Sequence, residues 1–241
     1  MGKTAILVDG GFYQRRAEVI YGKQTPEEKV RALIDHCYRH LETNRDKPAN
    51  ELYRIFYYDC PPLDKRVLHP FSKETIDYKK TTKYIDGMAF LDLMKQERKV
   101  ALRLGTLKGN GSDFIVPAPV VKKLLSKQLS FSKLKKNDFQ LDVRQKGVDM
   151  RIGVDIASLA YKKQVDQIVL IAGDSDFVPV AKVARREGID FILDPMWNHI
   201  SEDLREHIDG LNSYCEKPKN MKKKSTQNTR EAENSKGKNT V

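Results

Sequence analysis

The sequence is poor in cysteine and contains no long apolar run. Its three cysteines (Cys37, Cys60 and Cys215) lie far apart, and none belongs to a CxxC pair. An odd number of widely spaced cysteines argues against a disulfide framework and against a zinc ribbon, and it fits a reducing compartment. No stretch approaches the roughly 18 apolar residues that a membrane-spanning helix needs, and no N-terminal apolar segment follows a basic start. We therefore expect a cytoplasmic protein without a membrane partner.

Acidic residues are too few to balance the basic ones. The chain of 241 residues has 44 Lys and Arg against 33 Asp and Glu, which gives a net charge of +11. Such an excess favours polyanionic partners such as nucleic acid. Residues 216–241 alone hold eight basic residues and three Glu and have no apolar periodicity. The predicted organisation is a domain over residues 1–215 followed by a basic, disordered tail over residues 216–241.

Apolar strand patterns alternate with helical patterns along most of the chain. This alternation predicts an α/β fold with a mostly parallel central sheet flanked by helices. The segment 109–137 departs from the pattern because it is rich in lysine, so we interpret it as a basic insertion with an amphipathic helix that carries Lys122 and Lys123. Strands are predicted at 4–8, 52–58, 100–107, 167–172 and 189–193, and a final helix at 200–211.

Two of the predicted strands end in aspartate. Asp9 directly follows the apolar run AILV, and Asp174 follows VLIA with one glycine between them. The carboxyl ends of parallel strands meet at one edge of a sheet, where ligands bind. Carboxylates gathered there repel one another unless a cation neutralises them, which suggests Mg²⁺ or Mn²⁺. Asp and Ser are also ordinary helix N-caps, but a cap needs one such side chain and this junction supplies Asp174, Ser175 and Asp176.

The segment from Lys146 to Asp155 supplies two more acids. Asp149 and Asp155 are six residues apart, so on one continuous helix they would point about 120° away from each other. Asp149 can therefore join Asp155 only if it precedes or begins the helix, and Gly147 favours a break there. Asp155 can equally be a helix acid that neighbouring groups satisfy. Lys146 and Arg151 are candidate phosphate contacts or solvated surface charges.

Two further patterns have a structural interpretation and a functional one. His36 and His40 have the i, i+4 spacing of a zinc pair on a helix, but the Glu of HExxH is missing and Cys37 lies on another face. We therefore expect a surface or half-buried pair. Asp59 ends the second strand before two prolines, which favours a turn residue over a supporting role at the site.

In their order and spacing these motifs resemble the NYN domain family, a branch of the PIN-like nucleases, over roughly residues 4–212. The KGVD and GDSDF motifs are also similar to those of the LabA-like subgroup. The resemblance implies a Rossmann-like PIN fold, and it makes a homodimer plausible. The matching elements are ILVDGGF at 6–12, YYD at 57–59, KGVDMRIGVDIASLA at 146–160, IVLIAGDSDFVPVAKVARREGI at 168–189 and ISEDLREHIDGL at 200–211.

The resemblance also implies metal-dependent RNA cleavage. Position by position, it assigns Asp9, Asp149, Asp174 and Asp176 as catalytic, metal-binding acids and Asp155 as a fifth member of the metal site. Many relatives have an Asn shortly after the first Asp, whereas this chain has Gly-Gly-Phe-Tyr after Asp9.

Two functional hypotheses follow. The first is an endoribonuclease, a hydrolase that uses Mg²⁺ or Mn²⁺ to cleave phosphodiester bonds in RNA in preference to DNA. The alternative is a catalytically weak NYN module that binds RNA as a regulatory or defence component. The missing Asn and the long basic insertion favour the alternative.

Overall fold

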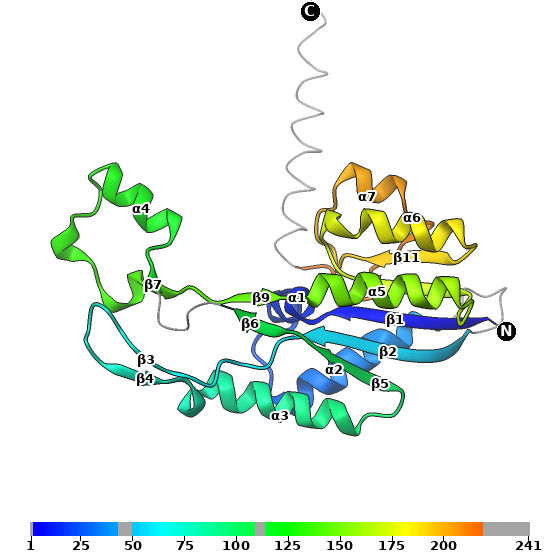
Figure 1. Cartoon of the computed structure of the whole chain (residues 1–241), viewed down its shortest axis with the longest axis horizontal. Helices are drawn as coiled ribbons and strands as arrows, with labels where there is room; N and C mark the ends of the chain where they lie inside the picture. Colours follow the sequence, from blue (N-terminus) through cyan, green and yellow to red (C-terminus); the bar gives the residue numbers. More distant parts are fainter. Residues whose placement is uncertain (1, 43–49, 109–113, 219–241) are drawn as a thin grey trace, which may run out of the picture.

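Six parallel strands form the central sheet of the computed structural model, which describes residues 2–42, 50–108 and 114–218. The strand order is β12-β11-β10-β1-β2-β5, so β1 lies inside the sheet (Figure 1). The predicted parallel sheet flanked by helices is therefore confirmed. The strands are β1 (Lys3–Asp9), β2 (Glu51–Asp59), β5 (Val100–Leu104), β10 (Gln167–Ile171), β11 (Asp190–Asp194) and β12 (Gly210–Leu211).

The register of the sheet brings the ends of the inner strands to one edge. In β1, the residues Ala5 to Val8 are fully buried, as a strand covered on both faces requires. Val8 pairs with Ile171 of β10, and Asp9 pairs with Tyr58 of β2. The residues that follow these strands therefore meet at the carboxyl edge of the sheet.

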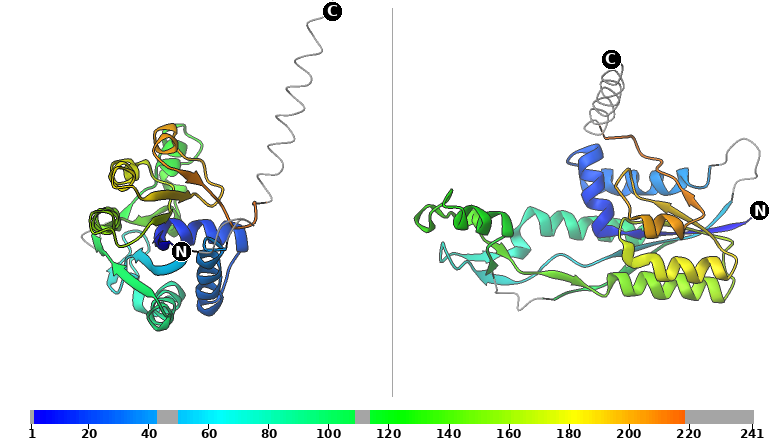
Figure 2. Two further views of the ribbon diagram at one scale, coloured as in Figure 1. Left: turned by 90° about the vertical axis from the view of Figure 1, so that its right-hand side faces the viewer. Right: turned by 90° about the horizontal axis from the view of Figure 1, so that it is seen from above.

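Helices cover both faces of the sheet and complete three layers (Figure 2). One face packs against α1 (Gly10–Tyr21), α2 (Pro26–Arg39) and α3 (Thr82–Gln96), and the other against α5 (Val148–Tyr161), α6 (Val178–Arg186) and α7 (Glu202–Glu206). Within the described residues, no helix has the length and hydropathy that crossing a bilayer requires. Short 3₁₀ helices lie at η1 (Tyr78–Lys80), η2 (Phe131–Lys133), η3 (Lys136–Asp138) and η4 (Ser175–Phe177).

The predicted final helix at 200–211 is wrong in its second half. The helix ends at Glu206, and Gly210 and Leu211 instead pair with β11 as strand β12. Asp209 holds the chain in this non-helical path before β12, because its carboxylate accepts hydrogen bonds from Arg185 and from the Phe191 amide. A polar side chain held by the neighbouring strand outweighs the helical spacing of the apolar residues.

An arm extends from the carboxyl edge of the sheet (Figures 1 and 2). We define the arm as residues 64–77, 106–108 and 114–146. The predicted strand at 100–107 is split at Gly105, where a Cβ would lie 2.8 Å from the Lys146 carbonyl oxygen. The arm contains β3 (Arg66–Leu68), β4 (Thr75–Asp77), β6 (Thr106–Lys108), β7 (Phe114–Ile115), α4 (Ala118–Leu125), β8 (Gln140–Leu141) and β9 (Arg144–Lys146).

Aromatic contacts join the two halves of the arm. The buried ring of His69, next to β3, packs against Phe114 and Phe139, and Phe71 stacks on Phe139. The sequence predicted the insertion and its amphipathic helix, but not the β3–β4 hairpin that supports it. Residues 109–113 of that insertion, and the predicted disordered tail from residue 219 onward, lie outside the described residues.

Candidate acidic site at the carboxyl edge of the sheet

Asp9 lies at the junction of β1 and α1. Its Oδ1 accepts a hydrogen bond of 3.0 Å from the Phe12 amide and so caps the helix. Gly10 permits the tight turn, because a Cβ there would lie 2.5 Å from the Tyr57 ring. Burial raises the pKa of Asp9 above the ordinary value, and the negative charges of Asp149 and Asp59 add to this rise.

Asp149 reaches the same edge from the other side. Gly147, with φ of 80°, breaks the chain before α5, so that Asp149 stands in the first turn of that helix. Burial raises the pKa of Asp149, and the charges of Asp174 and Asp176 raise it further. Asp149 therefore lies within electrostatic reach of both Asp9 and the aspartates that follow β10.

Asp174 caps η4 after the end of β10, and Asp176 lies within η4. Asp174 Oδ1 accepts a hydrogen bond of 3.1 Å from the Asp176 amide, and both side chains are exposed. We call Asp9, Asp149, Asp174 and Asp176 the acidic site.

The acidic site is open rather than tightly clustered. Among the described residues, no three of its carboxylates bring their oxygens within 4.8 Å of one another. Mg²⁺ retains several water ligands and needs only one or two protein carboxylates, so this wider spacing suits a hydrated ion.

Asp59, at the end of β2, lies next to the acidic site and is held by hydrogen bonds. Its buried carboxylate accepts four hydrogen bonds, which leaves it no free oxygen lone pair of good geometry for a metal. Burial raises the pKa of Asp59, and these four donors oppose the rise. These contacts fit a supporting role for Asp59 at the acidic site better than that of a simple turn residue. The donors are Gln14 Nε2 at 2.9 Å, Tyr57 Oη at 3.0 Å, the Cys60 amide at 2.7 Å and Gln145 Nε2 at 2.8 Å.

Three amide side chains near the acidic site were not predicted from the sequence. Gln14 and Gln145 bind Asp59, and Gln145 also lies 3.0 Å from where a Gly11 Cβ would be. Asn198 Nδ2 lies 3.2 Å from the Cβ position of Gly173, beside Asp174. No sequence signal marks them, because each comes from a different segment and none belongs to an acidic motif.

Comparison with known proteins places the chain in a family. A family model described as the NYN domain matches residues 68–213, more than half of the chain's 241 residues. The chain belongs to the NYN domain family. This family is part of the PIN-like superfamily, so the predicted family is confirmed, while the LabA-like subgroup stays a prediction. The match begins inside β3, so Asp9 and Asp59 lie before it.

One solved structure that matches the chain adds no functional information. It is a crystal structure of a protein of unknown function from Vibrio parahaemolyticus, with 15% sequence identity and a TM-score of 0.44. The alignment covers 88% of this chain and 93% of that one. No curated protein matches the sequence.

Asp155 is the predicted site residue that the NYN domain places apart from the others. Its carboxylate accepts hydrogen bonds from Tyr58 Oη at 2.8 Å and from Arg103 Nε at 3.0 Å. It lines a pocket of about 290 Å³ beside β2 and β5. Because α5 is continuous from Val148, Asp155 points away from Asp149 as helix geometry requires. We therefore omit Asp155 from the acidic site.

The predicted basic contacts lie at two distances from the acidic site. Lys146 immediately precedes the Gly147 break, and Arg151 Nη1 donates to the Gly147 carbonyl at 2.9 Å, so both stand at the start of α5. Lys122 and Lys123 are exposed on α4, far out on the arm (Figure 1).

No asparagine directly follows Asp9 in this NYN domain. The buried ring of Phe12 instead fills the space over Gly173, where a Cβ would lie 2.6 Å from Phe12 Cε2.

Proposed function

We propose that this NYN domain is a metal-dependent endoribonuclease that hydrolyses phosphodiester bonds of RNA. The observation that carries the proposal is the gathering of Asp9, Asp149, Asp174 and Asp176 at one edge of the sheet, from three separate segments. Burial raises the pKa values of Asp9 and Asp149, and neighbouring carboxylates raise them further; a divalent cation would relieve this repulsion. Membership of a PIN-like nuclease family supports the same reaction.

The acids of the proposed site would hold Mg²⁺ or Mn²⁺. A bound ion of this kind activates a water molecule and stabilises charge on the phosphate and the leaving oxygen. Asp59 would act as a positioning residue, because it holds Gln14 of α1 and Gln145 of the arm at the same edge. Lys146 and Arg151 would contact phosphate beside the scissile bond.

The arm supplies the positive charge for a nucleic acid backbone. Residues 114–146 contain eight Lys and Arg against two Asp. Of these, Lys136 and Arg144 form ion pairs with acids of the arm, and Lys122 and Lys123 stay exposed on α4. Phosphate contacts of this kind give affinity without sequence specificity. We therefore propose that the arm holds the RNA chain while the acidic site cleaves it.

Cleavage should depend on an added divalent metal. We expect the purified protein to cleave single-stranded or structured RNA with Mn²⁺ or Mg²⁺ and to lose this activity in excess EDTA, with recovery when the ion is restored. Gel analysis of end-labelled RNA measures the products, and internal fragments identify an endonuclease. A DNA of the same sequence tests the preference for RNA. Cleavage that persists in EDTA would contradict the metal requirement.

Removing the two lysines of α4 should weaken binding more than chemistry. The double substitution Lys122→Ala and Lys123→Ala is expected to reduce the slope of log K against log [salt] by about 1–2, with the rate at saturating RNA nearly unchanged. Fluorescence anisotropy over a salt series measures the slope. The control is the double substitution Lys162→Ala and Lys182→Ala. It removes two exposed lysines, one at the end of α5 and one in α6, which lie outside the arm. An equal effect of both pairs would mean that the arm has no special role.

The second candidate function is RNA binding without turnover. It is favoured by the absence of an Asn after Asp9 and by the long basic insertion. Tight RNA binding by the arm, with no cleavage under any metal condition, would select this function. The homodimer and the cytoplasmic location remain predictions from the sequence.

A further inference from the structure

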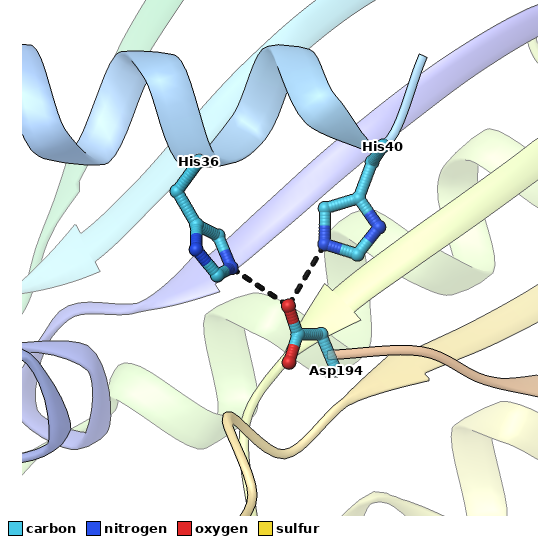
Figure 3. A group of neighbouring side chains, drawn as sticks. All are labelled: His36, His40 and Asp194. Carbon is cyan, nitrogen blue, oxygen red and sulfur yellow. Dashed lines mark hydrogen bonds and ion pairs between the residues drawn. The ribbon is translucent and has the colours of Figure 1, made fainter. Parts of the chain in front are cut away.

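A second group of metal-ligand side chains lies on the other side of the sheet from α5 and α6 (Figure 3). His36 Nε2 and His40 Nε2, one turn apart at the end of α2, both point at Asp194 Oδ2, at 2.7 Å and 2.9 Å. We call these residues the His–Asp–His cluster. All three side chains are at most 1% exposed, so the expectation of a surface or half-buried pair is wrong. The histidines are buried because the side of α2 that carries them, together with Leu33 and Cys37, packs against the sheet.

The cluster encloses a buried carboxylate. Asp194 Oδ2 accepts hydrogen bonds from both histidines, and Asp194 is fully buried at the end of β11. Its other oxygen accepts from the Met196 amide at 2.7 Å and from Ser213 Oγ at 3.1 Å. The two imidazoles complete this shell through Nε2.

The nearby cations are occupied elsewhere. The Arg16 guanidinium donates to the Met196 carbonyl, and Arg39 donates to the Tyr214 carbonyl. Among the described residues, the ion-pair partners of Asp194 are the two histidines alone. Buried charges in proteins are paired or bind metals, so either an extra proton on one imidazole or a metal ion must balance Asp194.

Two observations favour a metal over a proton. The first is the geometry of the donors, because one ligand atom from each of His36, His40 and Asp194 lies within 4.8 Å of the other two. Two imidazoles and one carboxylate form a donor set that zinc uses.

The second observation concerns unsatisfied atoms. Within the described part of the chain, the buried side-chain polar atoms without a hydrogen-bond partner are His36 Nδ1 and Tyr13 Oη, and the two rings pack edge to face with centroids 5.9 Å apart. A histidine that binds metal through Nε2 carries its proton on Nδ1 and donates it to a supporting group. Tyr13 Oη is an unused acceptor in the neighbouring ring.

We propose that His36, His40 and Asp194 bind one zinc-type transition-metal ion, which fastens α2 and residues 213–215 to the end of β11. The site is closed to solvent, so the ion is structural and takes no part in RNA cleavage. Tetrahedral zinc with bonds of about 2.0–2.1 Å holds its ligand atoms roughly 3.3 Å apart, so the three side chains separate by about half an ångström when it binds. A buried water molecule completes the shell.

Metal analysis of the full chain, purified without chelators, tests the proposal. We expect about one zinc ion per chain, and a melting temperature that falls by roughly 5 °C or more when the ion is removed and recovers on addition of ZnCl₂. His40→Gln should lose the ion, whereas His207→Gln, which changes a partly exposed histidine directly after α7 in the opposite helical layer, should retain it. A folded wild-type protein with no bound zinc and no response to added ZnCl₂ would overturn the proposal.

Cobalt spectroscopy shows whether position 40 contacts the ion. Co²⁺ in the wild-type protein should give visible d–d bands of a tetrahedral site, and His40→Cys should add a thiolate-to-cobalt charge-transfer band. Asp174→Asn should leave both the zinc content and the cobalt spectrum unchanged, which separates this site from the acidic site. A His40→Cys spectrum identical to that of the wild type would refute contact at position 40.

Discussion

Replacing Asp174 with Asn should reduce RNA cleavage by at least about 10²-fold and leave RNA binding close to the wild-type value. Asn has nearly the same shape and caps a helix as well as Asp does, so the junction of β10 and η4 should keep its structure. The substitution removes one negative charge from the group of four that would hold the cation. The rate at saturating RNA should therefore fall, while the arm continues to bind the phosphate backbone.

The matched control is Asp92→Asn, which removes a charge from an exposed aspartate of α3. Asp92 forms only an exposed ion pair with Lys95, and such pairs contribute little to stability. Single-turnover cleavage at saturating RNA, together with anisotropy binding in the same buffer, measures both quantities for each variant. Cleavage by Asp174→Asn at the wild-type rate would remove Asp174 from the active site and would leave the zinc proposal unaffected.

Replacing Asp59 with Ala should lower the free energy of unfolding by about 3 kcal/mol or more. The carboxylate of Asp59 is 6% exposed and accepts four hydrogen bonds, so its removal leaves several partly buried donors without a partner. Removal also releases Gln145 of the arm from Gln14 of α1. We therefore expect a loss of stability together with weaker cleavage, since the arm and the acidic site would no longer be held in one geometry.

Urea denaturation followed by far-ultraviolet circular dichroism measures the change in stability. Asp59→Asn preserves the shape but turns one amide group toward the existing donors, so its loss of stability should lie between those of the wild type and Asp59→Ala. Asp92→Ala again serves as the surface control, with an expected change of less than about 0.5 kcal/mol. A change below 1 kcal/mol for Asp59→Ala would mean that water replaces the carboxylate without cost and that Asp59 does not organise the site.

Much of the acidic site could be predicted from local patterns. The apolar runs before Asp9 and Asp174 identify buried strands, and parallel strands must place their ends together. Gly147 predicted the break that puts Asp149 in the first turn of α5. The helical angle left open whether Asp155 joins Asp149, and the resemblance to the NYN family assigned Asp155 to the metal site. Strand ends, glycine breaks and helical angles are properties of a few consecutive residues, so they can be predicted from the sequence.

Other parts of the molecule depended on contacts between distant segments. The β3–β4 hairpin has a charged sequence without a clear strand pattern, so it could not be predicted. It is stabilised by the packing of His69 against Phe114 and Phe139 from a later segment. Asp59 is a turn residue by its neighbours in sequence, but a buried support by its neighbours in space. The end of the last helix was set by Asp209 and β11 rather than by its own apolar spacing.

By itself, the sequence determined the class of the fold, the family and the edge at which the acids gather, because strand and helix periodicity follows from burial on the faces of a layered domain. Only the tertiary structure decided which carboxylates face one another, that a basic arm extends from that edge, and that His36 and His40 are sealed against Asp194. These outcomes depend on burial and on contacts between residues that are distant in the sequence. Local pattern carries no information about such pairs, because desolvation and electrostatic coupling arise only when the chain packs.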